Sequence, residues 1–144
     1  MLTIRLAESP QDIQACLRLR HEVFVEEQGV PVELEIDEHD RDDALHFIVL
    51  SKGESVGAGR VVTQDNIAKI GRLVVSQQYR GEGLGRALVE RILEHIRTLS
   101  AIDTAVLDAQ TQATRFYEGL GFRTVGTEFM DAGIPHIRMI RALD

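Results

Sequence analysis

The stretch that decides the fold of this chain joins a strand-like segment, a glycine-rich turn and the start of a helix. It reads Leu73-Val74-Val75-Ser76-Gln77-Gln78-Tyr79-Arg80-Gly81-Glu82-Gly83-Leu84-Gly85-Arg86. Four backbone amides at a helix N-terminus lack partners and the helix dipole is positive there, so such a turn can bind a diphosphate. The three glycines leave room for the phosphates and permit the backbone angles of an amide nest, and the two arginines add positive charge. An ordinary tight turn would account for one or two of these glycines, whereas three alternating glycines between arginines favour an anion site.

The spacing of the glycines excludes the two common nucleotide-binding loops. A dinucleotide fingerprint would need a further glycine at position 86 or 88, where the chain has arginine and leucine. A Walker loop would need Gly-Lys-Ser/Thr, which is absent from the turn. The pattern that remains is Arg/Gln-x-x-Gly-x-Gly/Ala, filled by Arg80, Gly83 and Gly85.

Hydrophobic periodicity places the other elements around this turn. Apolar residues at helical spacing predict a long helix from about Gly83 to Leu99, and Ser9-Pro10-Gln11-Asp12 is typical of the capped start of a first helix. We expect that helix to bury Ile13, Cys16, Leu17 and Phe24. Strands are expected over 2–6, 45–50, 56–63, 67–75, 104–109, 122–129 and 134–142, with a short helix over 111–120. This order predicts an α+β, three-layer fold in one domain, residues 1–144, with a mixed, mostly antiparallel central sheet and helices on both faces.

Composition narrows the classes of partner. The net charge of −7 and the pI near 5.2 argue against nucleic-acid binding, which needs a basic surface. The start of the chain lacks a signal-peptide pattern, and no apolar run is long enough to span a membrane. The single cysteine, Cys16, can form no internal disulfide and offers no zinc-ligand spacing, so we expect no metal site and a cytoplasmic location.

The charges are unevenly distributed along the chain. Glu22 to Asp43 holds ten acidic residues against Arg41 alone, whereas Lys69 to Arg97 holds six basic residues against three acidic ones. We expect the acidic part, over 26–43, to be a loop with one or two short helical turns. It would suit the entry of a cationic substrate beside a polyanionic cofactor, or it is simply a solvated face.

The turn at 80–85 resembles the hallmark motif of the GNAT superfamily of N-acetyltransferases. A second similarity is Tyr117-Glu118-Gly119-Leu120-Gly121-Phe122, which has a tyrosine four residues before Gly-Phe. Within the superfamily, the segments 20–28, 109–113 and 131–136 are similar to the ElaA-like and YjcF-like branch. The resemblance covers nearly the whole chain.

The resemblance implies acetyl-coenzyme A (acetyl-CoA) as co-substrate and a primary amine as acceptor. The amine would attack the thioester directly through a tetrahedral intermediate. The turn, from Arg80 to Arg86, would hold the diphosphate, and the pantetheine arm would pair with the strand before it, at Leu73, Val74 and Val75. A backbone amide near Val74 or Val75 would stabilise the oxyanion, and Tyr117 would act as general acid. The remaining residues expected beside the cofactor are Gln110 and Phe116.

The general base does not follow from the resemblance. Many superfamily members have a glutamate on the strand before the turn, but this chain reads Ile70-Gly71-Arg72-Leu73 there. The candidates are Glu26, Glu27, His46 and His136, with Glu27 first because it lies beside the expected substrate entrance. All four also fit structural roles, as surface charges or as hydrogen-bonded histidines.

Two other functions stay open from the sequence. One is a catalytically silent CoA-binding regulatory or interaction domain, and the other is a structural domain without a ligand. The presence of Tyr117 favours the enzyme over the first, and the glycine triplet argues against the second. The acceptor and the acyl group are not determined, and a homodimer is left open because similar proteins often form one.

Overall fold

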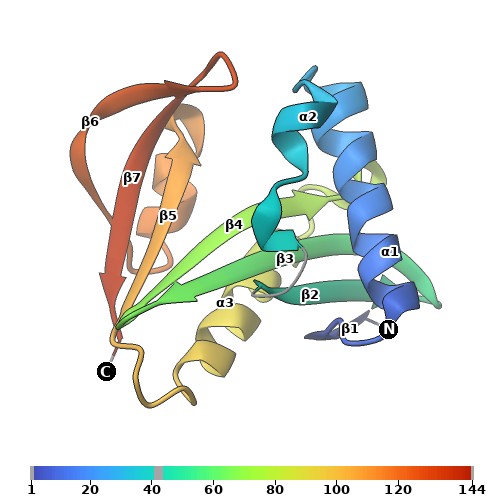
Figure 1. Ribbon diagram of the computed structural model, residues 1–144, viewed down its shortest axis with the longest axis horizontal. Helices are drawn as coiled ribbons and strands as arrows, with labels where there is room; N and C mark the ends of the chain where they lie inside the picture. The colour runs from blue at the N-terminus through green and yellow to red at the C-terminus, as the bar shows by residue number, and fades with distance from the viewer. Residues whose placement is uncertain (1, 41–43, 144) are drawn as a thin grey trace.

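A computed structural model, which describes residues 2–40 and 44–143, contains a seven-stranded sheet in the order β1-β2-β3-β4-β5-β7-β6 (Figure 1). Neighbouring strands are antiparallel except for the parallel pair β4 and β5. The predicted mixed, mostly antiparallel sheet is therefore confirmed. The strands are β1 (Leu2–Leu6), β2 (Ala44–Ser51), β3 (Glu54–Gln64), β4 (Ile67–Val75), β5 (Thr104–Gln110), β6 (Arg123–Asp131) and β7 (Ile134–Ala142).

Helices cover both faces of the sheet, as predicted (Figure 1). The α-helices are α1 (Pro10–Arg20), α2 (Val32–Glu35), α3 (Leu84–Ile96) and α4 (Thr114–Glu118), and a π-helical turn (His21–Glu27) continues α1. Because successive side chains of a strand point to opposite faces, Phe47 of β2 packs in the α3 layer and Ile48 in the α1 layer. Within the described ranges, no helix is long and apolar enough for a membrane crossing.

The start of α1 has the predicted cap. The Asp12 amide donates to Ser9 Oγ at 3.1 Å, and Pro10 is the first helical residue. Of the four residues expected to be buried, only Cys16 is fully buried; Ile13 and Phe24 are half-buried against the same cluster, and Leu17 is half-buried while Leu19 is buried instead. Spacings of three and four residues carry the stripe from Cys16 through Leu19 to Val23, which turns Leu17 toward the edge of the interface.

A bulge in β4 opens the middle of the sheet. Ala58 of β3 pairs with Val74, but Arg60 pairs with Gly71, so β4 has one extra residue here. Arg72 lies in this bulge with φ +51°. Bulges bend a strand, and β4 pairs with β5 only at Ile67 to Lys69. The rest of β4, which includes the predicted cofactor strand 73–75, therefore has no ladder with β5.

The acidic stretch forms short helical turns, as predicted, but it is not a uniformly solvated face. It contains the π-helical turn, α2 and a 3₁₀ turn at 38–40. Glu35 is buried, and α2 contacts the π-helical turn at the end of α1. The last acidic residues of the stretch, Asp42 and Asp43, and Arg41 lie outside the described residues.

Candidate active site

Two cavities meet where β4 and β5 diverge. A small cavity of about 160 Å³ is lined by Leu73, Val74, Val75, Gly85, Leu88, Val89, Phe116 and Tyr117. A large cleft of about 1050 Å³ lies between the two halves of the sheet and continues to α2 and the β6–β7 hairpin. Leu73 and Tyr117 line both. A ligand in the small cavity would thus be adjacent to a second ligand in the large cleft.

The glycine-rich turn has the geometry of an anion cradle at the mouth of the small cavity. Gly81 and Gly83 have φ of +80° and +81°, a left-handed conformation that glycine adopts without strain. Gly83 caps α3, and among the described residues no side chain caps this helix end. A Cβ at Gly85 would stand 3.7 Å from the ring of Phe116, so the small residue keeps this wall of the cavity open. These amides and this space fit a diphosphate ligand.

Two charged side chains of the turn, Arg80 and Arg86, form ion pairs with other protein groups. Arg80 forms a two-pronged ion pair with Glu27, with nitrogen–oxygen distances of 2.5 and 2.9 Å, and its Nε donates to the Val75 carbonyl at 3.0 Å. Arg86 is exposed and pairs with Glu90 at 3.5 Å, and Glu82 is exposed. The side chain of Arg80 is thus held by protein groups, and the cradle itself consists of backbone.

Tyr117 stands at the junction of the two cavities. Its ring makes edge-to-face contacts with Phe116 and Phe122, with centroid distances of 4.9 and 6.1 Å. Burial raises the pKa of Tyr117 to about 12, so the phenol keeps its proton at physiological pH. Among the described residues, none hydrogen-bonds to its hydroxyl. The site therefore holds a neutral hydroxyl between the cavities.

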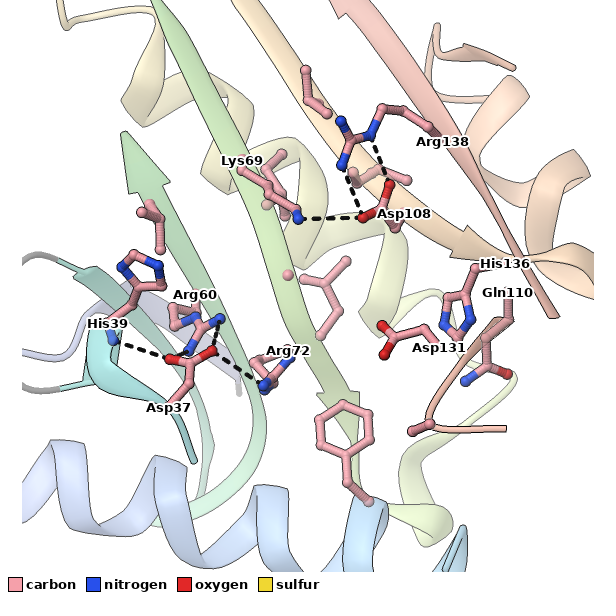
Figure 2. A pocket seen from close by; sticks show the side chains of 18 of the residues that line it. Asp37, His39, Arg60, Lys69, Arg72, Asp108, Gln110, Asp131, His136 and Arg138 are labelled. Atoms are coloured by element: carbon pink, nitrogen blue, oxygen red, sulfur yellow. Dashed lines mark hydrogen bonds and ion pairs between the residues drawn. The ribbon is translucent and has the colours of Figure 1, made fainter. Parts of the chain in front are cut away.

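A dense network of ion pairs lies behind one wall of the large cleft, and its outer part, at Asp37, Arg60 and Arg72, is drawn in Figure 2. Arg20 and Glu35 have only 1% and 2% of their side chains exposed, and Arg20 Nε donates to Glu35 Oε1 at 2.6 Å. Arg20 also donates to both oxygens of Asp40, at 2.7 and 3.0 Å. Although burial would raise it, the hydrogen bonds from Arg20 hold the pKa of Asp40 well below its usual range.

Two further arginines extend this network to the cleft surface. Arg60 donates to both oxygens of Asp37, at 2.7 and 3.1 Å. Arg72, in the β4 bulge, donates to the Glu35 carbonyl at 2.9 Å and to Asp37 at 3.3 Å. The pKa of Asp37 is lowered, because these arginines outweigh the opposing effect of burial. The network fixes α2 against the bulge and neutralises the acidic residues that face the cleft here.

The opposite wall, from β5, β7 and the end of β6, carries its own charged groups, and Lys69 of β4 joins them (Figure 2). Asp108 accepts from Arg138 Nε at 2.9 Å and pairs with Lys69 Nζ at 3.2 Å. Further along the same wall are Asp131 and His136. His136 Nδ1 lies 2.7 Å from the Ile134 carbonyl, which can only accept, so Nδ1 carries the proton and Nε2 of the neutral ring is the acceptor.

The sequence comparison identifies the family of this arrangement. Residues 6–143 match the acetyltransferase (GNAT) domain. The chain belongs to the GNAT acetyltransferase family. This membership implies acetyl transfer from acetyl-CoA in general terms.

Individual GNAT relatives support the same assignment over nearly the full chain. The uncharacterized N-acetyltransferase YjcF of Bacillus subtilis is 36% identical over 137 residues, 94% of this chain and 96% of the relative. The crystal structure of Escherichia coli ElaA has a TM-score of 0.89 at 32% identity and covers 98% of this chain and 99% of its own. The crystal structure of an acyl-CoA N-acyltransferase from Pseudomonas aeruginosa has a TM-score of 0.87 at 32% identity and covers 99% of both chains. The predicted likeness to the ElaA and YjcF branch is confirmed.

The GNAT fold brings most of the predicted cofactor residues together. Those that line the small cavity are Leu73, Val74, Val75, Gly85, Phe116 and Tyr117. The others of the turn are Arg80, Gly81, Glu82, Gly83, Leu84 and Arg86; Leu84 is buried in the α3 core layer. Gln110 lies apart from this group, because it does not line the small cavity; it lines the large cleft at the end of β5, and its amide nitrogen donates to Gln28 Oε1 at 3.4 Å.

The four candidate bases lie in different places. Glu26 is exposed and pairs with His21 at 3.4 Å. The hydrogen bonds from Arg80 lower the pKa of Glu27, and neither glutamate lines the large cleft. His46 is buried in β2, where burial lowers its pKa, and it lies outside the cleft lining. Of the four candidates, His136 alone lines the cleft.

Sequence reasoning did not single out the ion-pair walls of the cleft. Arg20 could have been recognised from the sequence as a buried charge, because it lies four residues after Cys16 and three before Val23, inside the apolar stripe of its helix. A charged residue in such a stripe needs a buried partner. The Lys69, Asp108 and Arg138 group had no local signal, since each comes from a different strand.

Proposed function

We propose that this GNAT domain transfers the acetyl group of acetyl-CoA to a primary amine bound in the large cleft. The observation that carries the proposal is the junction of the two cavities at Leu73 and Tyr117. Gly85, the last glycine of the turn, lines the small cavity, and the large cleft has the size of a ligand site. A donor and an acceptor can therefore meet beside a proton donor.

The backbone of the chain would hold and orient the co-substrate. The unpaired amides of the turn would bind the diphosphate, and the part of β4 without a β5 partner would pair with the pantetheine arm. Acetyl-CoA supplies the activated acetyl group as a thioester. Because Arg80 Nε already donates to the Val75 carbonyl, we assign the diphosphate site mainly to the amides of Gly81 to Gly85.

Two side chains would move protons. Tyr117 is protonated and borders both cavities, so it can donate its proton to the departing thiolate. His136 offers Nε2 as an acceptor toward the cleft, where it would take a proton from the amine directly or through water. Glu27 is a poor choice as base, because the ion pair with Arg80 stabilises its ionised form. We therefore assign the base role to His136 in place of Glu27.

The experiment that tests this proposal is an acceptor screen that follows thiol release from acetyl-CoA, with Tyr117→Phe as the comparison. We expect the variant to reduce kcat by roughly 100-fold, since general acid catalysis contributes about 10²–10⁴-fold, and to leave CoA binding nearly unchanged. The phenol with a pKa of about 12 stays protonated below pH 10, so the shape of the pH–rate profile should not change between pH 6 and 10. Equal turnover of the two proteins would remove Tyr117 from the mechanism.

Thermal unfolding separates this proposal from the two functions without catalysis. CoA at a hundredfold its Kd should stabilise the protein by roughly 2.7 kcal/mol. A shift with CoA but no thiol release with any amine would indicate a silent CoA-binding domain. No shift at millimolar acetyl-CoA would indicate a structural domain.

A further inference from the structure

The end of the large cleft where β4 and β5 are still paired carries two cations and one shared carboxylate. Lys69 Nζ and Arg138 Nε and Nη2 all contact Asp108, at 3.2, 2.9 and 3.2 Å. The two cationic side chains are 51% and 49% exposed, whereas Asp108 is 15% exposed. Burial would raise the pKa of Asp108, but the hydrogen bond from Arg138 and the charge of Lys69 lower it. The single negative charge of Asp108 is therefore shared by two positively charged side chains. Donor groups of Lys69 and Arg138 are thus left to face the cleft.

The acidic residues of the opposite wall do not offset this charge. Asp37 is bound by Arg60 and Arg72, and the buried Asp40 by Arg20 and Arg60. The expectation from sequence that the acidic stretch would attract a cationic substrate is therefore weakened by the structure. Asp65, in the turn between β3 and β4, is the other carboxylate near this end of the cleft.

The reacting end of the cleft lies elsewhere along β4. Leu73, which borders the small cavity, is four residues from Lys69, which sets an upper limit of about 13 Å at roughly 3.3 Å per residue, because the bulge at Arg72 shortens the strand. His136 and Asp131 line the cleft on the wall of β6 and β7 (Figure 2). The cleft thus has His136 and Asp131 on one stretch of wall, and a pair of cations that begins two residues further along β7, at Arg138, and continues to Lys69.

From this separation we propose that the acceptor is an elongated amine with an anionic group, a carboxylate or a phosphate, at its far end. Lys69 and Arg138 bind the anion, and the amine reaches the region between His136 and Tyr117. An α-amino acid, with one carbon between its charged groups, is too short to span these positions. A di- or tripeptide spans about 7–11 Å at roughly 3.3–3.6 Å per residue, which lies between the roughly 7 Å from Arg138 to His136 along β7 and the roughly 13 Å upper limit from Lys69 to Leu73 along β4. This inference rests on the proposed acetyl transfer and names its substrate class.

Pairs of acceptors that differ only in the charge of the far end test the inference with the wild-type protein. Gly-Gly-Gly and its C-terminal amide have the same reacting amine and differ in the charge of the far end, while glycine and glycinamide form a short pair. We expect kcat/KM for Gly-Gly-Gly to exceed that of its amide roughly tenfold, mainly through KM, because a charge-assisted hydrogen bond is lost in the amide. The short pair should show no preference for the acid. An aminoalkyl phosphate of similar length distinguishes a phosphate site from a carboxylate site.

Substitutions of Lys69 and Arg138 test whether these two cations cause the preference for the acid over the amide. Lys69→Met and Arg138→Met should each remove most of the preference for the acid, and Lys69→Glu should reverse it in favour of the amide. Lys52→Met is the matched control, because Lys52 lies in the β2–β3 turn outside both cavities, and it should keep the wild-type preference. A reversal of preference cannot result from partial unfolding.

The outcomes separate this inference from the proposed function. Equal kcat/KM for the tripeptide acid and amide in an active enzyme would overturn the inference and leave acetyl transfer intact. If no amine is acetylated, thermal shift in the presence of CoA with N-acetyl-Gly-Gly-Gly and its amide tests the anion site alone. Stabilisation by the acid only would support the site while the transferase proposal fails, and equal shifts would overturn the site.

Discussion

The small cavity and the large cleft meet at Leu73 and Tyr117, but different kinds of groups build them. The small cavity adjoins the glycine-rich turn at Gly85, and this turn presents backbone amides at consecutive positions, with Gly81 and Gly83 in left-handed conformations. The large cleft is walled by side chains from residues as far apart in sequence as Glu35 and Arg138, held by ion pairs. Backbone recognition suits a co-substrate shared by a whole family. Side-chain recognition suits an acceptor that differs between members.

The largest effect is expected from replacing Arg20, the buried arginine whose ion pairs support the wall of the large cleft. Arg20→Met leaves the buried carboxylates of Glu35 and Asp40 without their main partner. We expect the free energy of unfolding to fall by about 3–5 kcal/mol, measured by urea denaturation, while CoA affinity of the folded protein stays unchanged. Arg5→Met is the matched control, because it removes an exposed ion pair with Asp12 and should have no measurable effect. Equal stability of Arg20→Met and the wild-type protein would show that the network does not support the wall.

An effect of intermediate size is expected from a substitution in the glycine-rich turn, which forms the proposed anion cradle. Gly83→Ala places a Cβ in open space but forces alanine to adopt φ +81°, at a cost of roughly 1–2 kcal/mol, or a shift of the amides that follow. We expect CoA affinity, measured by calorimetry, to fall roughly tenfold. Gly126→Ala is the control, since Gly126 has φ +74° and open space in β6, far along the chain from the turn. If both variants bind CoA as tightly as the wild-type protein, the cradle is not the diphosphate site.

The smallest effect is expected at the ion pair between Glu27 and Arg80, which holds the arginine of the glycine-rich turn. Glu27→Gln weakens the hold on Arg80, so CoA should bind about two- to threefold more tightly, as is typical of an exposed pair. The pH dependence of kcat should not change, because we assign the base to His136. Glu26→Gln, which alters an exposed neighbour, should match the wild-type protein in both measurements. Loss of the pH dependence in Glu27→Gln alone would return Glu27 to the role of base.

The sequence predicted the fold and the turn well because both depend on local patterns. The β4 strand (Ile67–Val75) has the predicted bounds. The Ser9 cap was predicted from the residues around Pro10, and the order of elements was predicted from hydrophobic periodicity. The bulge at Arg72 was not predicted, since a non-glycine residue with positive φ has no local sequence signal. The Lys69, Asp108 and Arg138 group requires the pairing of β4, β5 and β7, which is a property of topology and not of any one segment.

The most direct test of the central claim is amide hydrogen exchange with and without CoA. If the backbone at the start of α3 holds the diphosphate, protection should increase at residues 81–86, with a smaller increase at 73–75 in β4. Residues 69 and 138, at the far end of the large cleft, should exchange at unchanged rates. Protection that appears at that far end, with none at 81–86, would contradict the assignment of the small cavity and its cradle to the co-substrate.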